Sequence, residues 1–443
     1  MENLTTAFRQ WWNNSAFLRI LFIGFVILLL QIPISMISNQ INERQWTEQD
    51  AIADVAQKWG QAQTLLGPRL VVPYYKVTTW KNKHGQTEQS RKKRYASFLA
   101  DELTIDAKID NQTRYRGIFK VPLYQSHIGI KGHFKKPNFE RWEIDPKLIL
   151  WQQAEFIFEV SGANSIQNSI ELNWNKKTYA METGLGESNI NAAGFNALLA
   201  DNFSKDKYSF DIQLTLNGSE RLFIAPMSGL TQISMSSNWP DPSFQGYKLP
   251  NQHEVSPDGF HAQWNIPAIS LSYPQQWLHH DFEHSNLQHS LVGVDFISPI
   301  DTYSMSERST KYALLFLLLT FALIWVFELI TKQRVHLMQY LFLGLGMCMF
   351  YLLLLAFSEH VGFTWAYVIA SALVVTMTTT YAKAIVKNNK YAFSIGGVSL
   401  ALYGYLYTLL QEQSYALLIG ALGIFLSLAI IMFLTRKIDW FAK

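Results

Sequence analysis

Apolar residues are distributed very unevenly along this chain. A first apolar run covers residues 20–37, a long polar stretch follows, and apolar sequence returns at residue 312 and continues to residue 434. The hydrocarbon core of a bilayer is about 30 Å thick, and a helix needs about 20 apolar residues to cross it. The pattern therefore predicts six spanning helices, at about residues 19–38, 312–330, 337–357, 363–382, 391–410 and 415–434.

The polar stretch between the first two spans, residues 39–311, is predicted to be mainly β-strand. Every second residue is apolar over 209–216, as in a strand with one buried face. Asn217-Gly218 follows, a dipeptide favoured in type I′ turns, and 221–225 is predicted to return as the second strand of a hairpin. With further strands at 69–80, 115–123 and 155–160, the region is expected to form a largely antiparallel sandwich of one or two lobes.

The first apolar run is expected to remain in the mature chain as an anchor. It is longer than the ~7–15 residues of a signal-peptide core, and no small-residue cleavage site follows it. Ile52, Val55, Ala56 and Trp59 then recur at helical spacing. The first helix is therefore predicted to continue beyond the membrane and to pack on the polar domain.

The loops between the predicted spans differ sharply in basic residues. Lys and Arg gather in the cytoplasmic loops of membrane proteins. The loops at 358–360 and 411–413 contain neither residue, whereas the alternate loops and both terminal segments are basic. This pattern predicts that residues 1–18 and 435–443 are cytoplasmic and that residues 39–311 lie on the opposite side. The basic residues are Arg9, Arg19, Lys332, Arg334, Lys383, Lys387, Lys390, Arg436 and Lys437.

Composition adds two exclusions. The 443 residues are 49% hydrophobic and 16% charged, against roughly 25% charged in soluble domains, and the net charge of +3 is too small to favour a nucleic-acid partner. The single cysteine, Cys348, lies in an apolar run, so the polar domain has neither a disulfide nor a Cys-ligated metal. Cys348 is expected to be a buried packing residue.

A basic run occupies residues 81–94. It resembles a nucleic-acid patch in composition, but no nucleic acid is expected outside the cytoplasm. We interpret it as the solvated tip of a hairpin, with contact to anionic lipid headgroups as the alternative.

The segment 279–289 is rich in histidine. His280 and His284 would share one face of a helix, as paired zinc ligands do, but their spacing lacks the His-Glu-x-x-His order of metalloproteases. A loop with incidental histidines is the preferred interpretation, and a metal site is the alternative. The chain shows no nucleophile, phosphate-binding or dinucleotide motif, so no catalytic, cofactor-binding or metal residue is predicted. The remaining members of the segment are His279, Asp281, Glu283 and His289.

Few ionisable residues fall within the predicted spans, which argues against an ion-coupled pump. Glu328 lies within a turn of the basic loop at 332–334 and is expected to form an interfacial ion pair. Glu359 and His360 are expected at the outer ends of spans, in a hydrogen bond to the polar domain. Small residues at Gly344, Gly346, Gly396 and Gly397 are predicted to let helices pack closely.

Several strings of this sequence match one known family in order. They are residues 66–73, 237–246, 303–312, 338–340, 350–360 and 434–440. The chain resembles the CreD family, multi-pass inner-membrane proteins of Gram-negative bacteria named for cell-envelope integrity, over essentially its full length and least over 160–205. The resemblance implies a role in envelope stress under a two-component system, with effects on tolerance to colicins and β-lactams. It implies no catalytic residues.

The expected architecture is therefore a six-helix transmembrane bundle, one span at 19–38 and five over 312–434. A mainly antiparallel β domain, residues 39–311, is inserted between spans 1 and 2 and lies in the periplasm. The expected function is non-enzymatic envelope integrity, with the lipid bilayer and an unidentified envelope protein or cell-wall component as partners. Self-association into a homo-oligomer stays open.

Two other functions stay open at this stage. A membrane insertase or lipid-handling protein of YidC-like topology is the first, although the insertase pattern has an Arg in an intramembrane groove and no span here carries one near its centre. A periplasmic enzyme that uses His280 and His284 is the second.

Overall fold

The computed structural model describes residues 16–81, 84, 86–186, 193–279, 287, 289–296, 302–331, 335–386, 389–412 and 415–436. The chain divides into two compact units, a helical unit of Met1–Gln49 with Ile300–Lys443 and a strand-rich unit of Asp50–Pro299. The strand-rich unit covers fewer residues than the predicted domain 39–311. The first helix extends past residue 39, and residues 302–311 fold as a helix of the helical unit.

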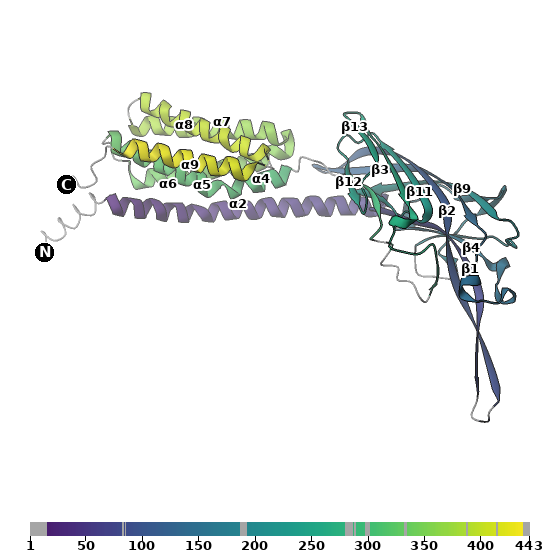
Figure 1. Cartoon of the computed structure of the whole chain (residues 1–443). Coiled ribbons are helices and arrows are strands. Elements are labelled where there is room, and N and C mark those ends of the chain that lie inside the picture. The colour runs from purple at the N-terminus through teal and green to yellow at the C-terminus, as the bar shows by residue number, and fades with distance from the viewer. Residues whose placement is uncertain are drawn as a thin grey trace. The chain divides into compact units, whose positions relative to one another are not determined.

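Long apolar helices run side by side in the helical unit (Figure 1). Five described helices are long and apolar enough to cross a membrane, and α4 with α5 forms a pair bent by 44° that adds a sixth crossing when counted as one span. Each predicted span falls on one of these helices. Their bounds are α2 Ala16–Trp59, α4 Thr302–Lys311, α5 Ala313–Thr331, α6 Leu337–Val361, α7 Phe363–Val386, α8 Asn389–Gln411 and α9 Ala416–Thr435.

Glycines allow close approach at some of the predicted positions. A side chain at Gly344 of α6 would overlap Leu30 of α2, and one at Gly396 of α8 would overlap Thr379 of α7. Gly397 has open space beside it, so the prediction of close packing is wrong for that residue. Cys348 is buried within α6, as expected.

The last turns of α2 pack within the strand-rich unit. The indole N–H of Trp59 donates to the carbonyl of Tyr124 at 3.1 Å, and the Arg114 guanidinium lies 3.9 Å from the centre of the Trp59 ring. Asp54 pairs with Arg116 at 2.9 Å. The predicted continuation of the first helix onto the polar domain is confirmed.

The described strands form one connected network of 16 strands. Most neighbours are antiparallel, and the parallel pairs are β1 with β10 and β2 with β11. The bounds are β1 Gln63–Lys81, β2 Thr87–Arg116, β3 Phe119–Lys135, β4 Glu155–Val160, β5 Glu171–Trp174, β6 Lys177–Ala180, β7 Glu182–Thr183, β8 Gly194–Leu198, β9 Lys207–Ser219, β10 Arg221–Ile224, β11 Ser228–Ser237, β12 Ser243–Gly246, β13 Gln252–Ser256, β14 Gly259–Pro267, β15 Gln276–Leu278 and β16 Val292–Asp295.

Aromatic side chains from separate parts of this network meet in the main core. The Phe156 ring of β4 lies 6.1 Å from the ring of Phe134 on β3 and 5.4 Å from that of Phe210 on β9. Because β4 is hydrogen-bonded to β1 and β8 and not to β3 or β9, these rings meet across the core. The largely antiparallel domain is confirmed, and it forms a single compact unit.

The predicted hairpin at Asn217-Gly218 is wrong. Both residues lie inside β9, paired with Gln125 and Tyr124 of β3, and the chain turns at Glu220 instead. β10 then pairs with β1 and β16 rather than with β9. The tertiary contact decides this, because a side chain at position 218 would overlap the Tyr124 ring and only glycine fits there.

The predicted strand at 115–123 is also wrong as a single element. β2 ends at Arg116, a turn follows at Gly117 with φ 61°, and β3 begins at Phe119. The interval therefore contains a tight hairpin. Tyr115 and Ile118 of this hairpin are apolar although they are exposed, so in the sequence they look like part of a continuous strand. The strands predicted at 155–160 and 209–216 are confirmed.

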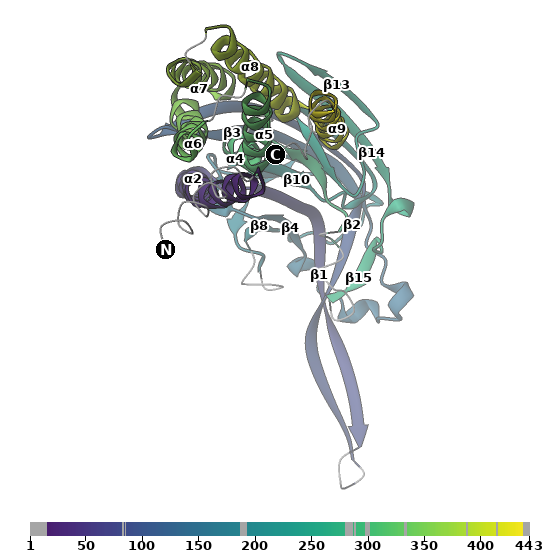
Figure 2. The ribbon, with the colours of Figure 1, turned by 90° about the vertical axis from the view of Figure 1, so that its left-hand side faces the viewer.

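β1 and β2 extend as a long two-stranded hairpin beyond the rest of the sheet (Figures 1 and 2). Their pairing runs from Arg69 opposite Leu99 to Lys81 opposite Thr87. Toward the free end of the hairpin, the last additional strand that pairs with it is β15, which lies against residues 96–98 of β2. The described residues of the basic run, 81, 84 and 86–94, therefore lie at a hairpin end, as predicted.

Buried Tyr273 makes the strand-rich unit sensitive to alkali. Its side chain is 5% exposed, its hydroxyl donates to the carbonyl of Pro226 at 2.9 Å, and burial raises its pKa to about 12. A phenol with a raised folded pKa stabilises fully below its unfolded pKa of about 10 and loses that contribution as pH rises through about 12. The lost stability is about 2–3 kcal/mol.

Tyr273→Phe is expected to remove this sensitivity. At about pH 9 the variant should be less stable than the native chain by about 1 kcal/mol, because it lacks the hydroxyl hydrogen bond, and the difference should vanish or reverse near about pH 12. Guanidinium unfolding of both proteins at the two pH values measures it. A stability difference that stays constant with pH would contradict the assignment.

Candidate functional site in the helical unit

Glu328 of α5 anchors a polar cluster where α2 begins. Its side chain is only 4% exposed, and one carboxylate oxygen lies 3.3 Å from a guanidinium nitrogen of Arg19. The other oxygen accepts the backbone N–H of Val335, just before α6. The predicted ion pair is found, but with Arg19; the loop 332–334 lies outside the described residues.

The sequence just before α6 explains why that helix starts there. The imidazole of His336 accepts the N–H of Met338 at 3.2 Å, and the carboxamide of Gln339 accepts the N–H of His336 at 2.8 Å. This reciprocal arrangement satisfies backbone donors that a helix start leaves without partners. It fixes Val335 and His336 beside Glu328.

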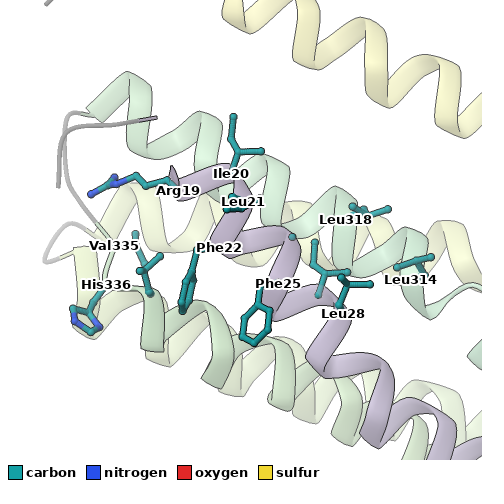
Figure 3. A pocket seen from close by; sticks show the side chains of 13 residues that line it. Arg19, Ile20, Leu21, Phe22, Phe25, Leu28, Leu314, Leu318, Val335 and His336 are labelled. Atoms are coloured by element: carbon teal, nitrogen blue, oxygen red, sulfur yellow. The ribbon is translucent and has the colours of Figure 1, made fainter. Parts of the chain in front are cut away.

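An open groove of about 1350 Å³ adjoins this cluster, between α2, α5 and the start of α6. Figure 3 shows Arg19, Val335 and His336 at one end of the groove and Leu314 at the other. Its walls are otherwise apolar, which suits a hydrocarbon chain with an anionic group at the Arg19 end. The other lining residues are Ile20, Leu21, Phe22, Gly24, Phe25, Ile27, Leu28, Leu318 and Leu337.

A second polar cluster forms at the opposite end of α6. The carboxylate of Glu359 accepts the hydroxyl of Tyr303 at 3.0 Å and lies 3.6 Å from the Nε of Arg44. Tyr303 belongs to α4 and Arg44 to α2, so the cluster ties three helices together. Glu359 was expected to bond the polar domain; its partner Tyr303 falls within the predicted segment 39–311 but belongs to α4 of the helical unit. His360 is exposed.

The histidine-rich segment is described only in part. His279 exchanges a 2.7 Å hydrogen bond with the hydroxyl of Ser97 and packs on the ring of Tyr95. His289 lies in a turn, whereas His280 and His284 lie outside the described residues. Within the described ranges, no three His, Cys, Asp or Glu side chains stand close enough to hold a metal ion.

The string 237–246 has a structural explanation. The backbone N–H of Asn111 in β2 donates to the Asn238 carboxamide at 2.7 Å, and the Asn238 amide donates back to the Asn111 carbonyl at 3.2 Å. These bonds hold the end of β11 against β2. β12 then pairs with β16.

Sequence reasoning did not single out Arg69. This arginine of β1 is 2% exposed and pairs with Glu159 of β4 at 2.5 Å. Burial lowers the pKa of its guanidinium, and the neighbouring Glu159 opposes that shift. The available signal was an arginine inside the otherwise apolar strand 65–72. No such signal marked Arg44, whose partner is more than 300 positions away.

Comparison with known proteins shows which family the chain belongs to. A family model described as "Inner membrane protein CreD" matches residues 15–441. Inner membrane protein CreD of Escherichia coli (strain K12) is 33% identical over 423 residues, which cover 94% of this chain and 92% of the relative. A substrate-bound M1 zinc metallopeptidase mutant from Deinococcus radiodurans matches with a TM-score of 0.21 and 6% identity over 44% of this chain and 42% of its own, a likeness too low to carry any argument.

The apolar helices, the inserted strand-rich unit and the full-length match agree with one another. The chain belongs to the CreD family of inner membrane proteins.

Proposed function

We propose that this chain maintains the integrity of the cell envelope through binding by its strand-rich unit, without catalysis. In this proposal residues 50–299 lie in the periplasm and both termini in the cytoplasm, and tolerance to colicins and β-lactams depends on the chain. The observation that carries the proposal is the insertion of a 16-strand unit between membrane helices of a CreD-family chain. The loop charges support the orientation.

Polar side chains that tie strands together in this unit support binding over catalysis. The buried Arg69 pairs with Glu159, and the carboxamide of Asn238 bonds both the backbone N–H and the carbonyl of Asn111. Such contacts stabilise strand packing and leave the exposed surface as the part available to partners.

A deletion strain tests this function directly. Cells that lack the chain should become sensitive to detergent, altered in colicin tolerance and altered in β-lactam tolerance, and plasmid expression of the native chain should reverse all three. Unchanged sensitivity to all three agents would rule the proposal out.

A lipid-handling or insertase function is the second candidate, and the groove beside α2 favours it. Arg19 at one end of an apolar groove resembles an anion-binding group beside a hydrocarbon path. Photo-crosslinkers distinguish the two candidates. One is placed at Phe25, which lines the groove, and the other at the exposed Gln245 of β12.

The adducts are identified by mass spectrometry from living cells. Adducts at Gln245 with one resident envelope protein or wall enzyme support the binding function. Adducts at Phe25 dominated by many nascent chains, with none specific at Gln245, support the second candidate.

A further inference from the structure

The β1–β2 hairpin carries a concentration of positive charge at its free end. Residues 75–81 and 86–95, called here the basic hairpin, contain six Lys or Arg and one Glu. Among its described cations, five form no ion pair with any described acidic side chain. These five are Lys76, Lys81, Arg91, Lys92 and Arg94, and all are exposed.

The register places like charges against one another. Lys76 lies directly opposite Lys92, and Tyr74 lies opposite Arg94 on the same face of the ribbon. The other face presents Arg91 opposite Val77. Like charges in directly opposed positions destabilise a strand pair, and an isolated two-stranded ribbon has little stability of its own. The charge pattern therefore does not stabilise the hairpin itself. An anionic partner would explain it, because its negative charge would offset the repulsion between the cations.

Trp80 adds a second property at the same end. Its side chain is 45% exposed and lies four residues beyond Lys76 on the same face of β1. Tryptophan is enriched at the interface between lipid and water, and Lys and Arg near a membrane are attracted to anionic headgroups. A ribbon with cations on both faces and an exposed indole near its tip suits insertion into a planar anionic surface, because both faces then meet headgroups.

We propose that the basic hairpin binds the surface of a bilayer that contains anionic phospholipid, with the cations on headgroup phosphates and Trp80 at the interface. This inference deepens the proposed function by naming one ligand of the strand-rich unit, and it rests on that unit acting by binding. The ligand is the lipid surface, and free phosphate is not sufficient.

The test uses the full chain in phosphatidylcholine nanodiscs. Cys348 is replaced by Ala, so that Thr79→Cys gives a single site for an environment-sensitive fluorophore on the exposed end of β1. Vesicles of phosphatidylcholine, with or without phosphatidylglycerol, are then added, and inorganic phosphate is added separately. A blue shift and a rise in emission report entry of the hairpin into the interface.

The expected result is a saturable response to phosphatidylglycerol vesicles only. Lys76→Gln with Arg91→Gln, Lys92→Gln and Arg94→Gln should raise the half-saturating lipid concentration at least about thirtyfold, since each cation near the surface contributes severalfold. The matched control replaces four exposed lysines elsewhere in the unit, Lys120, Lys147, Lys177 and Lys207, by Gln and should respond like the parent.

A salt titration of the parent protein tests the same proposal if the fourfold variant folds poorly. The parent protein should lose most of its response at about 1 M salt, where charges are screened within about 3 Å. An equal response to both vesicle types, no response to either, or full competition by inorganic phosphate would overturn the proposal. None of these results affects the deletion phenotype, so the two proposals fail independently.

Discussion

Glu159→Ala is expected to lower the free energy of unfolding of the strand-rich unit by about 3–5 kcal/mol. The substitution leaves Arg69, whose side chain is 2% exposed, without its carboxylate 2.5 Å away. Removal of one member of a buried pair is costly because the other charge stays in a medium that solvates it poorly. The loss should lower the midpoint of thermal unfolding by roughly 10 °C, measured by circular dichroism on the full chain in detergent.

Two comparisons isolate the cause of this loss. Lys131 and Asp211 form an exposed pair at 3.4 Å, with side chains 62% and 37% exposed, so Asp211→Asn should cost less than about 1 kcal/mol. Arg69→Met combined with Glu159→Leu should recover most of the stability, because an apolar pair of similar volume removes both buried charges. A Glu159→Ala variant as stable as Asp211→Asn would show that the buried pair is not what stabilises β1 against β4.

Glu328→Ala is expected to destabilise the junction of α5 and α6 by about 3 kcal/mol. The variant loses the acceptor of the buried Val335 N–H and the partner of Arg19 at once. The α6 cap at His336 stands next to this bond and should loosen with it. Hydrogen exchange at Val335 and in the first turn of α6 should therefore become about a hundredfold faster.

Glu328→Gln is the matched control for this prediction. Glutamine keeps an oxygen that accepts the Val335 N–H and loses only the charge that faces Arg19, whose side chain is 27% exposed. A partly exposed arginine retains water, so this variant should cost only about 1 kcal/mol. Equal exchange rates in the Ala and Gln variants would mean that the backbone bond contributes little and that the ion pair contributes most.

The sequence by itself determined the features that depend on local periodicity. An unbroken run of about 20 apolar residues has few alternatives to a spanning helix, because its backbone groups bond within the segment. The runs on α6, α7, α8 and α9 were located in this way. Strict alternation over 209–216 located β9, because successive side chains of a strand point to opposite faces.

Only the tertiary structure decided which distant groups meet. Asn217-Gly218 has the local preference of a turn, yet the close approach of the Tyr124 ring holds it extended inside β9. Arg19 meets Glu328, and Arg44 meets Glu359, across more than 300 positions of sequence. Periodicity carries no information about such pairs. Hydrophobic pattern fixes which face of an element is buried, whereas the partner on that face is set by packing of the whole chain.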